Sequence, residues 1–495
     1  MEAFNHLITG LQAALSLSNL LMALVGALLG TLVGVLPGLG PTSTMAMLIP
    51  LTAVLSPSGA IIMMAGIFYG AQYGGSTTSI LVNIPGEVSS VPTLLDGYPL
   101  AIQGKAGPAL GIAAIGSFVA GTGGVIGLTF FAPVLADQAL RFGPPEYFAL
   151  MVLALTVMVS VSGSSIIKGL LIGAFGYMMS LVGIGPTSGL PRFHYGAPVL
   201  YGGFETVTMA MGVFAIAEVL AGLEESRKAV THHKIEKVFP SLREIRQTIP
   251  AMFRGGIIGF LLGLLPGCNP AVTAFISYDV EKKISRHPER FGKGALEGVA
   301  APESANNATS SAAFVPLFAL GIPASPALAV LMGGLMIYGL QPGPLLFKDR
   351  PDFVWTIIGS MYIGNVMLLV LNLPLVGLWA RLTRAPFAIM APVILILCLI
   401  GSYSLRNSTF DMGMTLIFGV IGYFIRKYGW PTAPLVLCGI LGPILEKSLV
   451  NSLAMSAGSP MIFVTRPICL ALLIAAVALL LISLKVLRKD VREEY

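Results

Sequence analysis

Two runs of small polar residues, GGSTTS and NNATSS, lie within a predominantly apolar chain of 495 residues. An acidic residue, Glu303, comes shortly before the second run. Hydroxyl and carbonyl oxygens can replace the water around a cation, and hydroxyl and amide groups can donate hydrogen bonds to a carboxylate. We therefore predict an ion or substrate site from Gly74, Gly75, Ser76, Thr77, Thr78, Ser79, Glu303, Ser304, Asn306, Asn307, Thr309, Ser310 and Ser311.

Each of these residues has an alternative interpretation. Small residues in membrane helices also let two backbones approach closely, so a single Ser or Thr could serve packing alone. Adjacent amides are harder to explain by packing, which makes Asn306 and Asn307 the sharpest candidates. Glu303 could bind a proton or Na⁺, or could bond a broken helix end. We expect the helices to be interrupted within both runs, and the candidate Na⁺ ligands are Ser76, Thr77, Asn306, Asn307 and Thr309.

A second pair of segments carries a shared signature. Residues 30–41 read GTLVGVLPGLGP, residues 259–270 read GFLLGLLPGCNP, and seven of the twelve positions are identical. Proline breaks a helix, and broken helices at matching points of two halves indicate a transporter binding site. The predicted tip residues are Pro37, Gly38, Gly40, Pro41, Thr42, Ser43, Thr44, Pro266, Gly267, Asn269 and Pro270. Thr42, Ser43 and Thr44 could instead cap the next helix.

The order of these motifs indicates an internal duplication. GGSTTS ends 38 residues after Pro41, and NNATSS ends 41 residues after Pro270. An Ile-Pro pair follows each polar run, at Pro85 and Pro323. Three signatures in one order are better explained by two related halves than by chance.

The composition requires a membrane. Hydrophobic residues make up 55% of the chain and charged residues only 11%, against about 25% charged in soluble domains. We predict an all-α integral membrane protein with two related, inverted repeats and about 12 or more membrane segments. The predicted segments are 1–222 (first repeat), 223–254 (charged linker), 255–450 (second repeat) and 451–495 (last helix and basic tail).

Charge placement predicts the topology. The first 140 residues contain a single Lys or Arg, whereas residues 223–293 hold twelve and the last eleven residues four. Positive residues mark the cytoplasmic side, so we place the linker, residues 280–293 and the C-terminus there. Because both flanks of 255–279 are basic, this segment should enter the membrane and return as a hairpin. The copy at 21–56 has few flanking charges, which an inverted hairpin would show.

The sequence lacks the motifs of several classes of protein. The sequence contains no G-x-x-x-x-G-K-[ST] for ATP hydrolysis and no H-E-x-x-H for a zinc protease. Its four cysteines form no C-x-x-C pair, which indicates neither a cysteine metal site nor a disulfide framework. No motif pairs a nucleophile with a base, so we predict that the chain is not an enzyme. A secondary carrier is the first hypothesis. The rivals are a passive channel or exporter for small organic anions and, with the least support, an intramembrane enzyme.

The repeated motifs resemble those of one known family. The chain reads GTLVGVLPGLGPTSTMAMLIPLT, YGGSTTSILVNIPGE, GLLPGCNPAVTAF and EGVAAPESANNATSSAAFVPLFALGIPAS. These segments are similar to the large membrane subunit, TctA, of tripartite tricarboxylate transporters, and the similarity extends over nearly the whole chain.

The resemblance implies a multi-pass protein of the bacterial inner membrane. It implies import of citrate or related carboxylates, driven by a Na⁺ or H⁺ gradient and without another cofactor. The implied partners are a small four-helix membrane subunit (TctB-like) and a periplasmic solute-binding protein (TctC-like). An elevator-like movement rests on analogy with other carriers.

Overall fold

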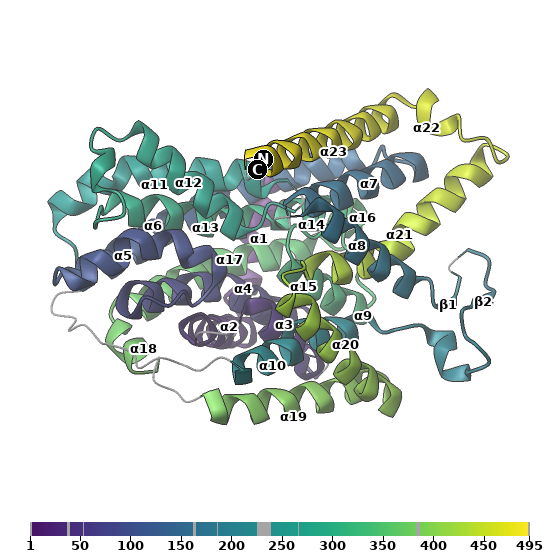
Figure 1. The fold of residues 1–495 in the computed structure, drawn as a ribbon, viewed down its shortest axis with the longest axis horizontal. Coiled ribbons are helices and arrows are strands. Elements are labelled where there is room, and N and C mark those ends of the chain that lie inside the picture. Colours follow the sequence, from purple (N-terminus) through teal and green to yellow (C-terminus); the bar gives the residue numbers. More distant parts are fainter. Residues whose placement is uncertain are drawn as a thin grey trace. The chain divides into compact units, whose positions relative to one another are not determined.

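The computed structural model describes residues 2–36, 40–52, 54–161, 165–185, 187–224, 239–265, 267–382 and 387–493. Over these residues the chain is helical apart from one short β-hairpin (Figure 1). Six of the described helices are long and apolar enough to cross a membrane, and five shorter helices are also apolar. The expected multi-pass helical membrane protein is therefore confirmed.

The elements follow one another along the chain with these bounds. The first half holds α1 (Glu2–Ala14), α2 (Leu17–Val35), α3 (Pro41–Thr52), α4 (Pro57–Val82), η1 (Val88–Ser90), α5 (Val91–Ile102), α6 (Ala106–Ala139), α7 (Pro144–Val161), α8 (Ile166–Ser180), β1 (Gly183–Ile184), β2 (Pro191–Arg192), η2 (Pro198–Gly202), α9 (Thr206–Ala210), the π-helix η3 (Met211–Ile216) and α10 (Ala217–Glu224). The second half holds α11 (Leu242–Gly263), α12 (Pro270–Ile284), η4 (Pro288–Arg290), α13 (Glu297–Ala312), α14 (Phe314–Leu320), α15 (Pro326–Ile337), α16 (Pro344–Asp349), α17 (Pro351–Asn372), α18 (Val376–Leu382), α19 (Phe387–Arg406), α20 (Thr409–Lys427), α21 (Ala433–Met455), α22 (Ile462–Thr465) and α23 (Pro467–Glu493).

These elements form two compact units, and each takes one segment from either half of the chain. Unit 1 comprises Met1–Ala136 and Gly222–Leu395, and unit 2 comprises Asp137–Ala221 and Ile396–Tyr495. Unit 1 therefore contains both copies of the proline-glycine signature and both polar runs. The predicted repeats, 1–222 and 255–450, are consecutive stretches of sequence and do not correspond to these two units. The division into repeats stays a prediction.

Glycines of the repeated signature bring matching helix pairs into contact in unit 1. A Cβ atom on Gly34 of α2 would lie 2.3 Å from the carbonyl oxygen of Ala71 in α4. A Cβ atom on Gly259 of α11 would lie 2.2 Å from the carbonyl oxygen of Ala305 in α13. These distances are too short for any side chain, so both glycines are needed for backbone-to-backbone packing. The helices that carry the polar runs, α4 and α13, are thus each held by the helix before its own tip.

The helices that follow the two tips begin as predicted. α3 starts at Pro41 and α12 at Pro270, where a missing N–H costs no hydrogen bond. The apolar stretch at 252–266 predicted a helix, and α11 begins ten residues before that stretch, at Leu242. The reason is a capping box, in which Ser241 Oγ accepts from the N–H of Glu244 at 3.3 Å and the Glu244 carboxylate accepts from the N–H of Ser241 at 2.7 Å.

The interruption predicted within both polar runs is wrong. α4 is continuous through Gly74–Ser79, and α13 is continuous through Asn306–Ser311. The hydroxyls accommodate themselves in the helix by donating to carbonyls one turn earlier, as Ser79 does to Gly75 at 3.0 Å. Each break comes later, at a left-handed residue before the Ile-Pro pair: Asn83 (φ 58°) and Gly321 (φ 72°).

In unit 2, ion pairs join segments that are far apart in sequence. Arg192 pairs with Glu446 at 2.5 Å, Arg466 with Glu146 at 2.6 Å, and Arg426 with Glu218. Paired charges are the form in which ionised side chains are tolerated within an apolar protein.

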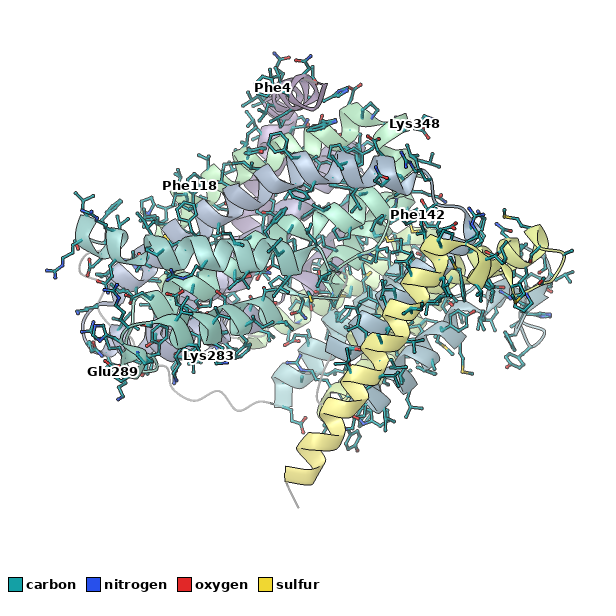
Figure 2. The ribbon with its side chains drawn as sticks, turned by 90° about the horizontal axis from the view of Figure 1, so that it is seen from above. Phe4, Phe118, Phe142, Lys283, Glu289 and Lys348 are labelled. Carbon is teal, nitrogen blue, oxygen red and sulfur yellow. The ribbon has the colours of Figure 1, made fainter. Side chains whose placement is uncertain are left out.

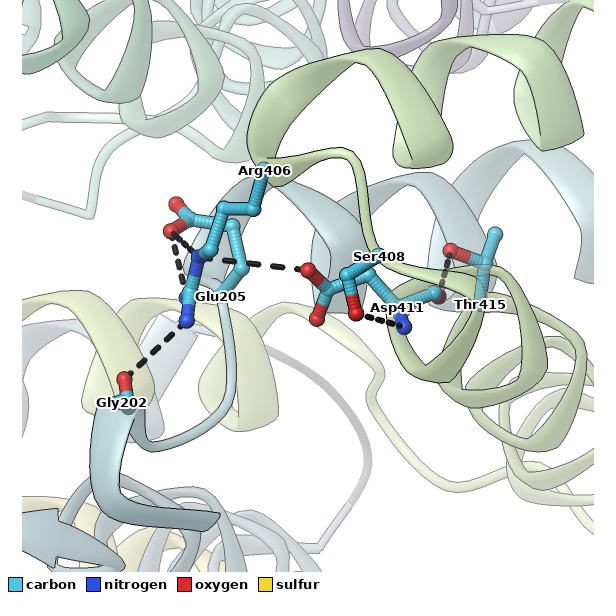
Figure 3. Close-up of polar contacts among 6 residues, drawn as sticks. All are labelled: Gly202, Glu205, Arg406, Ser408, Asp411 and Thr415. Atoms are coloured by element: carbon cyan, nitrogen blue, oxygen red, sulfur yellow. Dashed lines mark hydrogen bonds and ion pairs between the residues drawn. The ribbon is translucent and has the colours of Figure 1, made fainter. Parts of the chain in front are cut away.

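A fourth ion pair of unit 2 lies at the turn between α19 and α20 (Figure 3). The Arg406 guanidinium donates to the Glu205 carboxylate at 2.6 Å and to the Gly202 carbonyl at 3.2 Å. It also lies 4.0 Å from the carboxylate of the buried Asp411. These contacts fix the turn against the start of α9.

Candidate functional site

Glu303 lies where three other helices of unit 1 converge on α13. Its side chain is fully buried, with 0% of its surface exposed. Thr93 of α5 donates to Glu303 Oε1 at 2.5 Å, and Ser117 of α6 donates to Oε2 at 3.4 Å. The hydroxyl of Ser76, in the GGSTTS run of α4, lies near the same carboxyl group but is buried without a hydrogen-bond partner. The first polar run therefore comes close to this acid, which itself lies just before the second run in α13.

Asn307 completes the cluster from the next turn of α13. Its Nδ2 donates to Ser117 Oγ at 2.7 Å and to the Glu303 carbonyl at 3.1 Å. Ser117 thus connects the amide of Asn307 with the carboxyl of Glu303. We call Ser76, Thr93, Ser117, Glu303 and Asn307 the Glu303 cluster.

Two further side chains of α13 are buried without a hydrogen-bond partner. Neither Oδ1 nor Nδ2 of Asn306 has a partner, and neither does Oγ of Ser304. Both residues are 0% exposed. Buried polar groups are almost always bonded, and an unmet one costs about 1–3 kcal/mol. An amide in this condition is expected where a bound ion, substrate or water supplies the partner.

A small pocket reaches the Glu303 cluster from the side of α6. Polar groups and apolar side chains line it together: Tyr73, Ser76, Thr77, Leu110, Ala113, Ala114, Ser117, Asn372 and Val376. Ser76 and Ser117 belong both to this pocket and to the Glu303 cluster. The pocket wall also carries Asn372, whose Oδ1 is buried without a partner. Its lining offers hydroxyl and amide oxygens to a small polar ligand next to a carboxyl group.

Six polar residues of this region were not predicted from the sequence. Thr93 and Ser117 bond Glu303, and Asn372 lines the pocket. Tyr73 donates to Asn365 Oδ1 at 2.6 Å, and Asn365 Nδ2 donates to Thr122 Oγ1 at 2.7 Å. Apart from Tyr73, which directly precedes GGSTTS, each is a single polar residue outside the two runs. Isolated polar residues in apolar helices are costly and often functional, which is the signal that could have found them.

The tip residues are placed at helix starts. Asn269 Oδ1 accepts from the N–H of Val272 at 3.1 Å and caps α12. Thr44 Oγ1 donates to the Gly40 carbonyl at 3.1 Å. Of the predicted tip residues, Ser43 and Thr44 are buried, whereas Thr42 is partly exposed. Gly267 is left-handed, with φ 89°. Pro37, Gly38 and Pro266 lie outside the described residues.

The predicted Na⁺ ligands fall on two sides of α13. Ser76 and Thr77 line the pocket, and Asn307 bonds Ser117 beside it. Thr309 instead faces α11 and α12, where its hydroxyl lies 2.7 Å from Thr273 Oγ1 and 2.9 Å from the Gly259 carbonyl. A site at the pocket would therefore use Ser76, Thr77 and Asn307 without Thr309.

The remaining residues of the two runs have packing contacts. Gly74 lies against α2, because a Cβ there would be 2.3 Å from the Thr31 carbonyl. Ser79 Oγ donates to Ser90 Oγ at 2.7 Å, and Ser311 Oγ donates to the Gly121 carbonyl at 3.2 Å. Gly75, Thr78 and Ser310 are likewise buried in their helices.

The chemistry of the site is that of binding and ion exchange. The Glu303 cluster supplies one carboxyl group, hydroxyl groups and an amide. A carboxyl group can hold a proton or a cation, and hydroxyl and amide donors can hold a carboxylate. Within the described residues no three His, Cys, Asp or Glu side chains are grouped to hold a metal ion.

Comparisons with known proteins give one family. The model of the tripartite tricarboxylate transporter TctA family matches residues 20–437. An uncharacterized 52.8 kDa protein in the TAR-I ttuC' 3' region of Agrobacterium vitis is 44% identical over 485 residues, which are 98% of this chain and 97% of that protein. An uncharacterized protein in the TAR-II ttuC' 3' region of the same organism is 45% identical over 215 residues, which are 43% of this chain and 89% of that protein. No solved structure matches the chain.

Proposed function

This chain belongs to the TctA family, the large membrane subunit of tripartite tricarboxylate transporters. From that premise we propose that it imports citrate or a related carboxylate, and that a Na⁺ or H⁺ gradient drives the import. It is a transporter subunit and not an enzyme. The observation that carries the proposal is the Glu303 cluster. In this cluster Thr93 and Ser117 bond a fully buried carboxyl group, Asn307 of the second run bonds Ser117, and Ser76 of the first run lies nearby in the wall of a pocket. The candidate substrate and ion ligands are the residues of the two runs and tips named above.

Charge explains why substrate and ion should bind together. A carboxylate brought into a buried site must be neutralised, because isolated charges in a low-dielectric interior cost many kcal/mol. The hydrogen-bond partners of Glu303 are hydroxyl groups, which leave its own charge uncompensated. A proton or Na⁺ that enters with the substrate would offset one of these negative charges. The same ion could then couple uptake to its gradient.

We further propose that the second tip belongs to a re-entrant hairpin. α11 and α12 lie on either side of Pro266–Pro270, and Arg254 and Glu281, which flank residues 255–279, are joined because Arg254 donates to both oxygens of Glu281 at 2.9 and 2.6 Å. A segment whose two flanks touch cannot place them on opposite sides of a membrane. The matching α2 and α3 would form the inverted hairpin of the first repeat. Such tips are tolerated at membrane depth where they line a cavity.

The proposed location is the bacterial inner membrane, with the C-terminus in the cytoplasm. In unit 2, Lys168 Nζ lies 5.6 Å from the centre of the Trp430 ring. Lys168 is therefore at the same end of the unit as the basic last turn of α20. α23 begins at the other end, beside the Arg466–Glu146 pair. Its 27 residues span about 40 Å, which is long enough to cross a membrane, and the positive charge of the tail sequence favours the cytoplasmic side for the C-terminus. The proposed partners are a TctB-like four-helix subunit and a TctC-like periplasmic binding protein.

Uptake of labelled citrate tests the proposal. Cells expressing this chain with its two partners would receive Na⁺ and pH gradients separately. We expect saturable accumulation that needs one of the two gradients and the binding protein. Equilibrating flux that needs neither would favour the passive channel and overturn the proposal. Gradient-driven uptake of another carboxylate, without uptake of citrate, would change the substrate and leave the carrier standing.

A further inference from the structure

A second buried acid, Asp96 of α5, holds the two repeats together. Its carboxyl group is 0% exposed. Oδ1 accepts hydrogen bonds from the N–H groups of Gly292, Gly294 and Ala295 at 2.9, 2.8 and 2.8 Å. Oδ2 accepts from the hydroxyl of Tyr278 at 2.9 Å. Because all four partners are donors, Asp96 acts as an acceptor only, which is the behaviour of a carboxylate.

The connection between α12 and α13, residues 285–296, has a backbone conformation that suits the Asp96 carboxylate. Gly292 and Gly294 are left-handed, with φ 82° and 108°, and this lets successive N–H groups turn toward one oxygen. Gly298, at the start of α13, leaves room for the carboxylate, since a Cβ there would lie 2.1 Å from Asp96 Oδ2. The connection lies at the end of unit 1 where Figure 2 labels Lys283 and Glu289. It joins α12 to α13 and belongs to the second repeat.

Asp96 is one helical turn from the Glu303 cluster. Thr93, which donates to Glu303, precedes Asp96 by three residues and shares its face of α5. The two contacts therefore fix α5 against α13 at two neighbouring points. A helix turn is stiff, so a shift of α5 at Asp96 would move the Thr93 hydroxyl away from the Glu303 carboxyl.

We propose that Asp96 is a positioning residue, which locks α5 to the α12–α13 connection and thereby keeps Thr93 on Glu303. The inference rests on the proposed function only in assigning Glu303 to the transport site. Its consequence is that the two repeats do not separate at this end of unit 1 during transport. Separation would expose one carboxylate and three N–H groups that lose their partners together.

A double-mutant cycle tests this role. Asp96→Ala removes the lock, and Thr93→Val removes the hydroxyl while keeping the shape of its side chain. We expect either variant to raise the half-saturating substrate concentration by about tenfold, the effect of losing one hydrogen bond to a charged group. The double variant should be no worse than Thr93→Val alone, because Asp96 acts through Thr93. Independent, multiplying effects would overturn the proposal.

Gln103→Ala is the matched control. Gln103 lies on the same helix and donates to the Lys293 carbonyl of the same connection at 2.8 Å, but this contact is exposed. We expect wild-type uptake from it. Asp96→Asn keeps one acceptor oxygen and should restore most of the affinity lost in Asp96→Ala. If Asp96→Ala does not reach the membrane, Asp96→Asn takes its place in the cycle, with a smaller shift that must again not add to that of Thr93→Val.

Hydrogen exchange separates this inference from the proposed function. In purified protein, loss of the Asp96 carboxylate should speed exchange in residues 91–102 and 292–296, and Gln103→Ala should leave both segments protected. If wild-type protein transports no carboxylate but this exchange pattern holds, the lock stands and the proposed function fails. Unchanged exchange in an Asp96 variant would refute the lock whatever is transported.

Discussion

Asn306 is buried in a way that packing alone does not explain. Its amide has two donors and an acceptor, none of which has a partner, in a helix that is buried on every side. Asn365 shows the ordinary alternative in the same unit, because its amide is bonded to Tyr73, Thr122 and the Phe118 carbonyl. Substitution by leucine should therefore impair uptake at Asn306 and thermal stability at Asn365.

Asn306→Leu should abolish uptake while the protein still inserts and folds. Replacing an unpaired buried amide by an apolar side chain of similar size is neutral or stabilising for the fold. Asn365→Leu should instead lower thermal stability, because it leaves two hydroxyl groups and a carbonyl without their partner. Uptake and detergent melting curves of both variants measure this. Wild-type uptake by Asn306→Leu would remove the residue from the site.

Glu303→Gln should remove gradient-driven accumulation. The glutamine side chain neither takes up and releases a proton near neutral pH nor carries a negative charge, although it keeps an oxygen that can accept from the Thr93 hydroxyl. We expect accumulation to fall at least about tenfold, as for loss of a charged partner worth about 1.5–3 kcal/mol. Glu297→Gln is the control, because Glu297 bonds Gln247 at an exposed position of the same helix. Accumulation at the wild-type level in Glu303→Gln would show that the coupling ion binds elsewhere.

At the scale of helices, glycine position decides how closely two helices pack. On α11, Gly259 faces the Ala305 carbonyl, where an added Cβ would be 2.2 Å from oxygen. Gly256, on the same helix, has Ala120 Cβ as its nearest neighbour at 3.4 Å. The first distance forces α11 away from α13, whereas the second is close to an ordinary contact.

Gly259→Ala should therefore destabilise the protein and Gly256→Ala should not. Overpacking of a tight contact costs about 1–3 kcal/mol, and alanine in an open helix position is slightly stabilising relative to glycine. Melting temperatures of the two variants in detergent measure the difference. Equal melting temperatures would mean that α11 and α13 pack less closely than the structure shows.

Elements were predictable where one local signal dominates. The apolar runs at 17–36, 59–82 and 108–135 predicted α2, α4 and α6 within a few residues, because twenty apolar residues have few other solutions in a membrane. The run at 353–380 predicted one helix, but α17 ends at Asn372 and α18 follows from Val376. α5 was missed because its twelve residues contain two prolines, a glycine and an acid. Helix interruption within GGSTTS was wrong because close packing and hydroxyl-to-carbonyl bonds outweigh the low helix propensity of these residues.

At the scale of the whole molecule, the sequence predicted the residue types at the site better than their arrangement. Glu303 and both polar runs were identified from clustering alone, and the structure connects Asn307 of the second run to the Glu303 carboxyl group through Ser117. Thr93, Ser117 and Asp96 could not be identified in the same way. Their importance comes from contacts across about 190 to 210 residues of chain, which no local pattern records.

The placement of charge predicts which segments of the chain face the cytoplasm. The Arg254–Glu281 pair requires both flanks of the second hairpin to lie together. Arg243 and Lys283 are exposed on those two flanks, and Ser459 lies in the turn between α21 and α22. Cysteines at Arg243 and Lys283 should react with an impermeant maleimide only from the cytoplasmic face, together with a C-terminal tag, whereas a cysteine at Ser459 should react only from outside. The native cysteines are buried and give a low background. Labelling of Arg243→Cys and Lys283→Cys from opposite faces would mean that the segment crosses the membrane, and the re-entrant hairpin would be wrong.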